Sequence, residues 1–207
     1  MAHEFVIIED GETSSVITLE DHELKVIEEL GLLDLSCPDS CRALKKIAVC
    51  ESPIERIMGL ALLSGPPSIL DICFGVAWAH EENTALKALL HNVEFEITPQ
   101  QTFMGASGKV YRADFFINAF VSEVEGRHGL LSLPVAVECD GHDFHEKTKA
   151  QAMRDKKRDR DFIAAGVPVL HFTGHEVWGT PSKCVEEIGD YLVNEMYRKY
   201  AEYNPKP

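Results

Sequence analysis

The chain has few cations and no long apolar run. It has 207 residues, with 20 Lys and Arg against 34 Asp and Glu, which gives a formal net charge of -14. No apolar stretch approaches the roughly 20 residues that a membrane-spanning helix needs, so we expect no membrane partner. An acidic chain cannot attract nucleic acid through its total charge, because phosphate contacts need cations at the contact surface. Any such binding must use a local cationic patch.

Cysteine is also scarce, with six residues scattered along the chain. The first residues show no basic segment followed by an apolar one, as a secretory signal would. We therefore expect reduced thiols and a cytoplasmic location. Cys37 and Cys41 have a spacing found in some zinc sites, but two more ligands would be needed, so we do not expect zinc.

The apolar pattern predicts an α/β fold with a mixed sheet. A hairpin pairs its strands antiparallel, whereas a strand–helix–strand unit pairs them parallel. The pattern predicts strands over 5–8, 93–97, 109–117, 133–139 and 167–172, and helices over about 19–33, 42–49, 53–63, 146–165 and 181–200.

Three of these strands have distinct patterns. The strand 109–117 alternates, which predicts Tyr111, Ala113, Phe115 and Ile117 on one face and Arg112, Asp114 and Phe116 on the other. The strand 133–139 is apolar enough to be central and buried on both faces. Pro168 predicts an edge position for the strand 167–172.

Three carboxylates fall on these strands. Asp114 interrupts an aromatic strand, and Glu138 and Asp140 share one face at the end of an apolar strand. If the two strands are neighbours, the carboxylates converge, and converging carboxylates need protonation or a divalent cation. Oxygen ligands favour Mg²⁺ or Mn²⁺, which can polarise a phosphodiester. The alternative is that Asp114 is solvated and that Glu138 and Asp140 mark a strand end before a turn.

A cationic helix follows the carboxylates. Four residues at helical spacing share one face, where a phosphate backbone would be held: Lys147, Gln151, Arg154 and Arg158. The alternative is an exposed helix with ion pairs along its length, in which Asp155 and Asp159 take part.

Together, these segments resemble the PD-(D/E)xK nuclease superfamily. The resemblance rests on Asp114, on "VECDG" with Glu138 and Asp140, on His145, and on "RDKKRDRDFIAAGVPVLHFTGHEVW". Within that superfamily, the chain resembles restriction-endonuclease-like proteins related to the very-short-patch mismatch repair endonuclease. The segment "SPIERIMGLAL" resembles the first helix of these proteins. The resemblance covers roughly residues 51–180. It implies a four-stranded mixed sheet flanked by helices, in a nuclease-like domain 51–207 after an N-terminal extension 1–50.

The resemblance also implies a metal site. Its ligands would be Asp114, Glu138 and the backbone carbonyl of Cys139. Asp140 stands where the superfamily usually has a lysine, so another group must position the attacking water. The candidates for that role are His142, His145 and Lys147.

Further residues have two interpretations each. Glu55 matches a first-helix glutamate that often reaches the metal, but with Ser52 it also forms a helix-capping box. Gln100 or Gln101 resembles a glutamine found before the core aspartate. His171, in an apolar strand, is more typical of a core or edge histidine than of a ligand.

Two functions follow from these observations. The first is a Mg²⁺- or Mn²⁺-dependent DNA endonuclease, with Asp114, Glu138, Asp140, His145 and Lys147 as the catalytic candidates. The second is a catalytically weak or inactive module of the same fold that binds nucleic acid or a protein partner, in which the N-terminal extension docks the partner. RNA is the weaker substrate hypothesis, because no feature of the sequence reads a 2′-hydroxyl. The sequence carries no clear signal for a dimer.

Overall fold

The computed structural model describes residues 2–9, 12–30, 44, 47–64, 93–124, 127–141 and 149–203. The helix expected over 42–49 lies largely outside this part of the chain. The elements are, in chain order, β1 (Ala2–Glu9), β2 (Glu12–Glu20), α1 (Asp21–Leu30), α3 (Pro53–Ser64), β3 (Val93–Met104), β4 (Val110–Val124), β5 (Arg127–Asp140), α6 (Lys149–Ala164), β6 (Val169–Thr173), α7 (Gly174–Gly179) and α8 (Pro181–Tyr203).

A four-stranded mixed sheet forms the centre, in the order β3-β4-β5-β6. β3, β4 and β5 pair antiparallel, and β6 pairs parallel to β5 after the crossover through α6. The mixed sheet predicted from the sequence is therefore confirmed. Val135, Ala136 and Val137 of the interior strand β5 are fully buried. β6 lies at the edge of the sheet, as Pro168 predicted.

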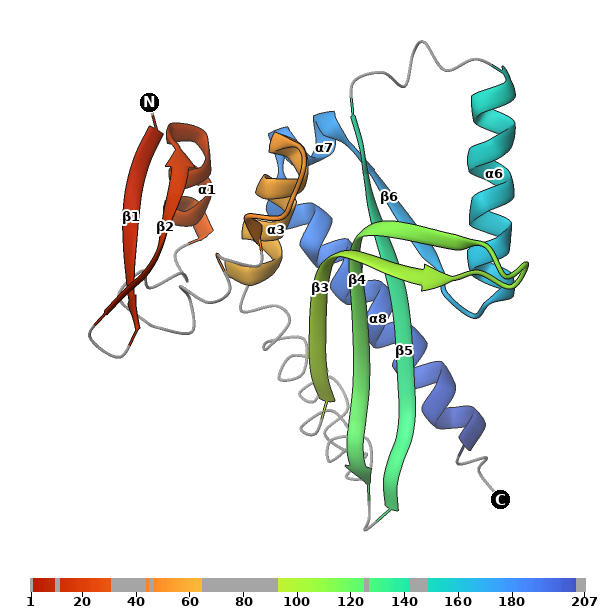
Figure 1. Ribbon diagram of the computed structural model, residues 1–207. Coiled ribbons are helices and arrows are strands. Elements are labelled where there is room, and N and C mark those ends of the chain that lie inside the picture. The colour runs from red at the N-terminus through yellow and green to blue at the C-terminus, as the bar shows by residue number, and fades with distance from the viewer. Residues whose placement is uncertain are drawn as a thin grey trace.

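Helices cover both faces of this sheet (Figure 1). On one face, α3, α7 and α8 pack against β4 and β5 in the larger core, which includes Ile57, Phe115, Val137 and Ile188. On the other face, Phe162 of α6 packs in a smaller apolar cluster. In the described part of the chain, no helix combines the length and apolar character needed to cross a membrane.

The structure adds two elements that the sequence pattern did not predict. β2 pairs antiparallel with β1 in a separate two-stranded sheet, and α1 begins only at Asp21. The short helix α7 begins after Thr173, whose side chain accepts a hydrogen bond from the Glu176 backbone while the Glu176 carboxylate accepts one from Thr173. Such reciprocal capping stabilises a helix start.

The N-terminal residues share the core of the sheet domain. Leu19 and Ile27 belong to the same buried cluster as Ile57 of α3. The carboxylate of Glu23, which is 1% exposed, forms an ion pair with Arg56 of α3. The expected extension 1–50 is thus joined to the sheet domain by apolar packing and by a buried charge pair.

The β3–β4 hairpin bends over toward α6 (Figure 1). Tyr111 and Ala113 pack in the smaller cluster with α6, whereas Phe115 and Ile117 pack in the larger core on the opposite face. The single alternation predicted for this strand is therefore wrong, because a regular strand would keep Ala113 and Phe115 on one face. The change of face occurs at Asp114.

The partner strand shows the physical cause of the bend. Pro99 pairs with Phe115 and Gln101 with Ala113, which leaves Gln100 opposite Asp114 and outside the ladder. Gln100 has a φ of 54°, in the left-handed region that side chains other than glycine rarely adopt. Such strain is found where the surrounding structure holds a residue in place for a site.

Candidate active site

Asp114 and Glu138 are brought together by the antiparallel pairing of β4 with β5. Phe115 pairs with Val137, so the next residues toward the end of β5 are Asp114 and Glu138. The Asp114 carboxylate accepts a 2.8 Å hydrogen bond from the backbone N–H of Cys139. Burial raises the pKa of Asp114, and the nearby charge of Glu55 raises it further, whereas the Cys139 N–H lowers it.

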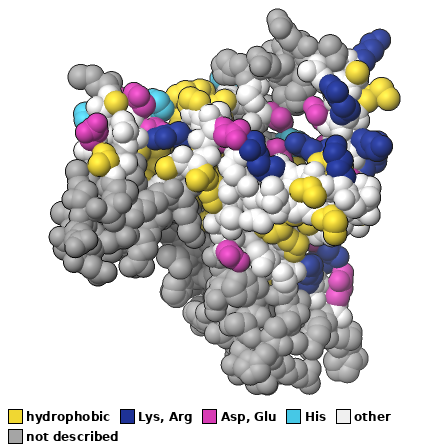
Figure 2. Space-filling model, in the orientation of Figure 1, with side chains coloured by type: hydrophobic (Ala, Val, Ile, Leu, Met, Phe, Trp, Pro, Cys, Tyr) yellow, Lys and Arg dark blue, Asp and Glu magenta, His cyan; other side chains and the backbone are white. Residues whose placement is uncertain are grey.

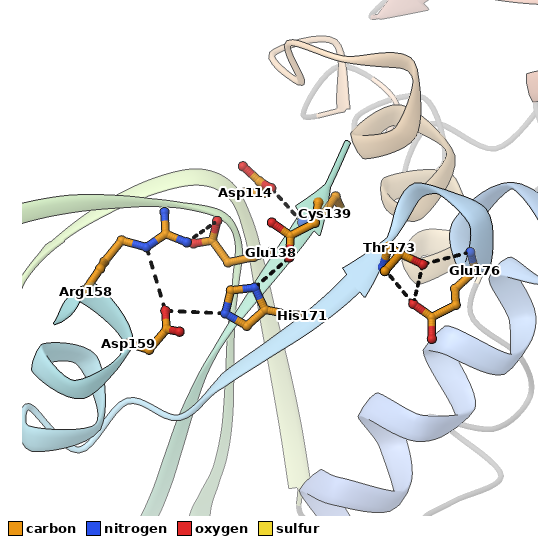
Figure 3. A network of polar contacts seen from close by, with 9 residues as sticks. Asp114, Glu138, Cys139, Arg158, Asp159, His171, Thr173 and Glu176 are labelled. Atoms are coloured by element: carbon orange, nitrogen blue, oxygen red, sulfur yellow. Dashed lines mark hydrogen bonds and ion pairs between the residues drawn. The ribbon is translucent and has the colours of Figure 1, made fainter. Parts of the chain in front are cut away.

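Glu138 is buried, and among the described residues only one of its carboxylate oxygens has a partner. Its Oε2 lies 3.2 Å from Nη2 of Arg158, which reaches in from α6 (Figure 3). Its Oε1 is buried and has no hydrogen-bond partner among the described residues. Burial raises the pKa of Glu138 to about 7, with the charge of Asp114 adding to the rise and Arg158 opposing it.

Glu55 meets this pair of carboxylates from α3. Its backbone N–H donates to Ser52 Oγ, so Ser52 caps the helix as predicted. The Glu55 carboxylate accepts from the Ser52 hydroxyl at 2.8 Å and from the Glu51 backbone N–H at 2.9 Å, where a capping box would use the Ser52 backbone N–H. Its other oxygen accepts a 2.7 Å hydrogen bond from Nε2 of Gln100. The Gln101 amide instead bonds to the Thr102 carbonyl, so Gln100 is the glutamine beside Glu55. Contact with the capping residue Ser52 and proximity to the site are therefore compatible for Glu55.

His171 lies between two carboxylates on the other side of Glu138. Its Nδ1 is 3.0 Å from Oδ2 of Asp140, and its Nε2 is 3.4 Å from Oδ1 of Asp159 on α6 (Figure 3). A carboxylate can only accept, so the Asp140 contact is a hydrogen bond when Nδ1 carries a proton, whereas the Asp159 contact is an ion pair only when the whole ring is protonated. The hydrogen bond with Asp140 raises the pKa of His171, against an opposing effect of burial.

A pocket of about 340 Å³ lies beside these groups, between α6 and the strands β5 and β6. In Figure 2, Asp and Glu side chains lie in a hollow that is bordered by Lys and Arg side chains over α6. The pocket therefore offers both carboxylates and cations to a bound molecule. Its lining residues are Glu138, Asp140, Ala152, Asp155, Lys156, Arg158, Asp159 and His171.

The predicted phosphate-holding residues of α6 differ in their exposure to solvent. Gln151 and Arg154 are exposed, whereas Arg158 faces the sheet and Glu138. Lys147 and His145, like His142, lie outside the described residues, as do Cys37 and Cys41. The structure thus brings Asp114, Glu138, Asp140, Arg158 and Glu55 into one region.

The donor chemistry fits a divalent cation at Asp114 and Glu138. Both are buried or half-buried carboxylates with raised pKa values, and Glu138 Oε1 lacks a partner. Oxygen donors of this kind suit Mg²⁺ or Mn²⁺. No group of three or more His, Cys, Asp or Glu side chains that could hold a metal occurs within the described ranges, and the Asp140 carboxylate bonds to His171.

His171 is the site residue whose position the sequence pattern did not reveal. It stands between Leu170 and Phe172, so its setting is typical of a core histidine. The parallel register that pairs it with Glu138 is a contact between distant parts of the chain. The sequence held one indication of this position. The strand with His171 follows the helix after Glu138, and a strand–helix–strand unit places its two strands in parallel.

No protein-family model, curated protein or solved structure matches this chain.

Proposed function

We propose that this protein is a divalent-metal-dependent endonuclease that hydrolyses phosphodiester bonds in DNA. The observation that supports this most is the buried Glu138, which lies beside Asp114 at the end of β5 and whose Oε1 has no hydrogen-bond partner in the part of the chain that the structure describes. The helix, three strands, helix and strand from α3 to β6 give a mixed sheet flanked by helices, as the restriction-endonuclease-like resemblance implies.

Each charged group has a distinct role in this proposal. Asp114, Glu138 and the Cys139 carbonyl would hold Mg²⁺ or Mn²⁺, with Glu55 beside them. When bound, the ion would polarise the phosphodiester and lower the pKa of a water. Arg158 stands 3.2 Å from Glu138 and offers a guanidinium to a phosphate oxygen. Asp140 orients His171, whose ring, when protonated, would supply a positive charge in place of the missing lysine.

Other residues in this proposal act around the site. His145 and Lys147 remain candidates for positioning the water. Gln151 and Arg154, exposed on α6, hold the DNA backbone beside the pocket.

One observation favours the alternative of a binding module without catalysis. Arg158 already neutralises Glu138 through its ion pair, and a carboxylate with a fixed cationic partner needs no metal. In that case the pocket would bind an anionic group of a nucleic acid or protein partner without cleaving it.

Cleavage of plasmid DNA in Mg²⁺ or Mn²⁺ distinguishes the two functions. Asp114→Asn and Glu138→Gln keep the side-chain shapes and remove the charges. We expect both to lower the cleavage rate by more than about 100-fold, since even the partners of metal ligands contribute 10–100-fold. Asp190→Asn, on the exposed side of α8, is the matched control and should cleave as the wild type does. Equal cleavage by all four proteins, or none by the wild type on DNA or RNA, would refute the endonuclease.

A further inference from the structure

The outward side of α6 carries charge of one sign only. Every exposed charged residue of this helix is a cation, although the whole chain has a net charge of -14. The three acidic residues of the helix, Asp155, Asp159 and Asp161, are partly buried against the rest of the protein. The exposed cations are Lys149, Arg154, Lys156, Lys157 and Arg160.

The tip of the β3–β4 hairpin continues this surface. Met104 and Val110 are cross-strand partners beside the tip, and they are 68% and 64% exposed. The tip is fixed to α6, because the Asp161 carboxylate accepts hydrogen bonds from the Ser107 backbone N–H and hydroxyl, at 2.8 and 2.6 Å. Lys109, between Val110 and the turn, is exposed as well. The hairpin tip and α6 therefore form one surface without an exposed acidic side chain.

The dimensions of this surface match a nucleic-acid backbone. Lys149 and Arg160 are 11 residues apart on the helix, which corresponds to about 16 Å at 1.5 Å per residue. Phosphates along one strand of duplex DNA rise by about 3.4 Å each, so the row of cations spans about five phosphates. A two-stranded β-ribbon such as the hairpin tip fits the major groove.

We propose that the outward side of α6 and the hairpin tip together form a platform that grips double-stranded DNA. The cations of α6 hold one backbone, and the Met104–Val110 pair enters the groove and makes apolar contacts with base edges. This inference rests on the proposed function, since it assigns the duplex form of its substrate. Lys156 also lines the pocket beside Arg158, so the platform adjoins the candidate active site, whereas Lys149 and Lys157 do not line that pocket.

A membrane surface fits the same residues less well. An interfacial helix presents a continuous apolar stripe to the lipid. On α6 the exposed large apolar residues are Met153 and Ile163, which lie ten residues apart with Lys156, Lys157 and Arg160 between them. The cations, rather than apolar side chains, are the continuous feature.

Binding to a labelled DNA duplex in EDTA tests the platform without any cleavage. Lys149→Gln with Lys157→Gln removes two cations from it, and Lys25→Gln with Lys183→Gln removes two exposed cations elsewhere. In a fluorescence-anisotropy salt series, the first double variant should lower the slope of log affinity against log salt by about two. Its affinity at 0.1 M salt should fall about tenfold or more. The second double variant should bind as the wild type does.

The contribution of Met104 and Val110 to binding is tested with a separate variant. Met104→Ser with Val110→Ser removes no charge, so it should weaken duplex binding while the salt slope stays unchanged. Circular dichroism checks that each variant folds. Equal losses in the two charge variants, unchanged binding in all variants, or binding to phosphatidylserine vesicles but not to DNA would each overturn the platform.

These outcomes are separable from those of the proposed function. Platform-dependent binding by a protein that cleaves nothing would leave the platform in place and refute the endonuclease. Cleavage of DNA by variants with unaltered binding would support the endonuclease and refute the platform.

Discussion

Glu138 is a buried carboxyl group, and the described residues give a partner to only one of its oxygens. Its pKa is raised from 4.5 to about 7, mainly by burial. The folded protein therefore binds this proton more tightly than the unfolded chain does. The stabilisation is complete below about pH 4.5 and is lost as the pH rises through about 7.

We predict that Glu138→Gln removes this part of the pH dependence. Between pH 4.5 and 8 the wild type should lose about 3 kcal/mol of unfolding free energy that the variant keeps, at 1.36 kcal/mol per pKa unit. Urea unfolding in EDTA at several pH values measures the difference. His171, whose pKa is also raised, contributes a loss of the same sign in both proteins, so only their difference is diagnostic. Parallel pH profiles would contradict the claim that the cost of burying Glu138 outweighs its ion pair with Arg158.

The sequence predicted several residues of the site but not the contacts that they make. Asp114 and Glu138 were predicted for the site from their types and spacing, and Glu55 from the resemblance; the structure brings the three into one region. The partners of these residues could not be predicted, because they depend on register and on packing between distant segments. Gln100 of β3 donates a hydrogen bond to Glu55 of α3, and His171 of β6 contacts Asp140 of the neighbouring strand β5.

At the scale of elements, the strongest predictions came from segments with strong local patterns. The apolar run of β5 predicted an interior strand, and Gly166, with a φ of 78°, follows the end of α6 as expected for a helix stop. β2 was missed because its polar residues carry no strong alternation. The bend at Asp114 was missed because it depends on the unusual backbone of Gln100 in the partner strand.

The hairpin tip gives a prediction at this scale. A Cβ at Gly105 would collide with the Asp161 carboxylate and come within 2.8 Å of the Tyr111 ring. We expect Gly105→Ala to lower the unfolding free energy by roughly 1–3 kcal/mol, the usual range for an overpacked site. Gly141→Ala is the control, since a Cβ there meets no atom within 4 Å. Chemical denaturation of both variants tests this, and equal stabilities would show that the tip does not pack on α6.

At the scale of the whole molecule, charge is segregated. The chain is strongly acidic, yet every exposed charged residue of α6 is a cation. The acidic residues of the helix and Arg158 are partly buried. The total charge predicted that any phosphate contact must be local. It could not predict which side of the helix each charge takes, since that follows from packing against Phe162 and the hairpin.

The N-terminal residues and the sheet domain should unfold together. Glu23 is buried and pairs with Arg56, and Leu19 and Ile27 lie in the main core. We predict that Glu23→Gln lowers the unfolding free energy by roughly 1–3 kcal/mol, because it removes the charged partner of Arg56, which is partly exposed and keeps its hydrogen bond to the Thr18 carbonyl. Glu29→Gln, which breaks only a surface pair with Lys25, should cost less than about 0.5 kcal/mol. Calorimetry should show one transition for each protein, and a separate early transition would contradict the shared core.

The central claim is that Asp114 and Glu138 hold a divalent cation. Isothermal titration with Mn²⁺ and Mg²⁺, on the wild type and on Glu138→Ala, tests it most directly, with circular dichroism to confirm that the variant is folded. We predict binding by the wild type that disappears in the variant. Wild-type protein that binds neither ion, or a variant that binds as well as the wild type, would contradict the account and favour the binding module.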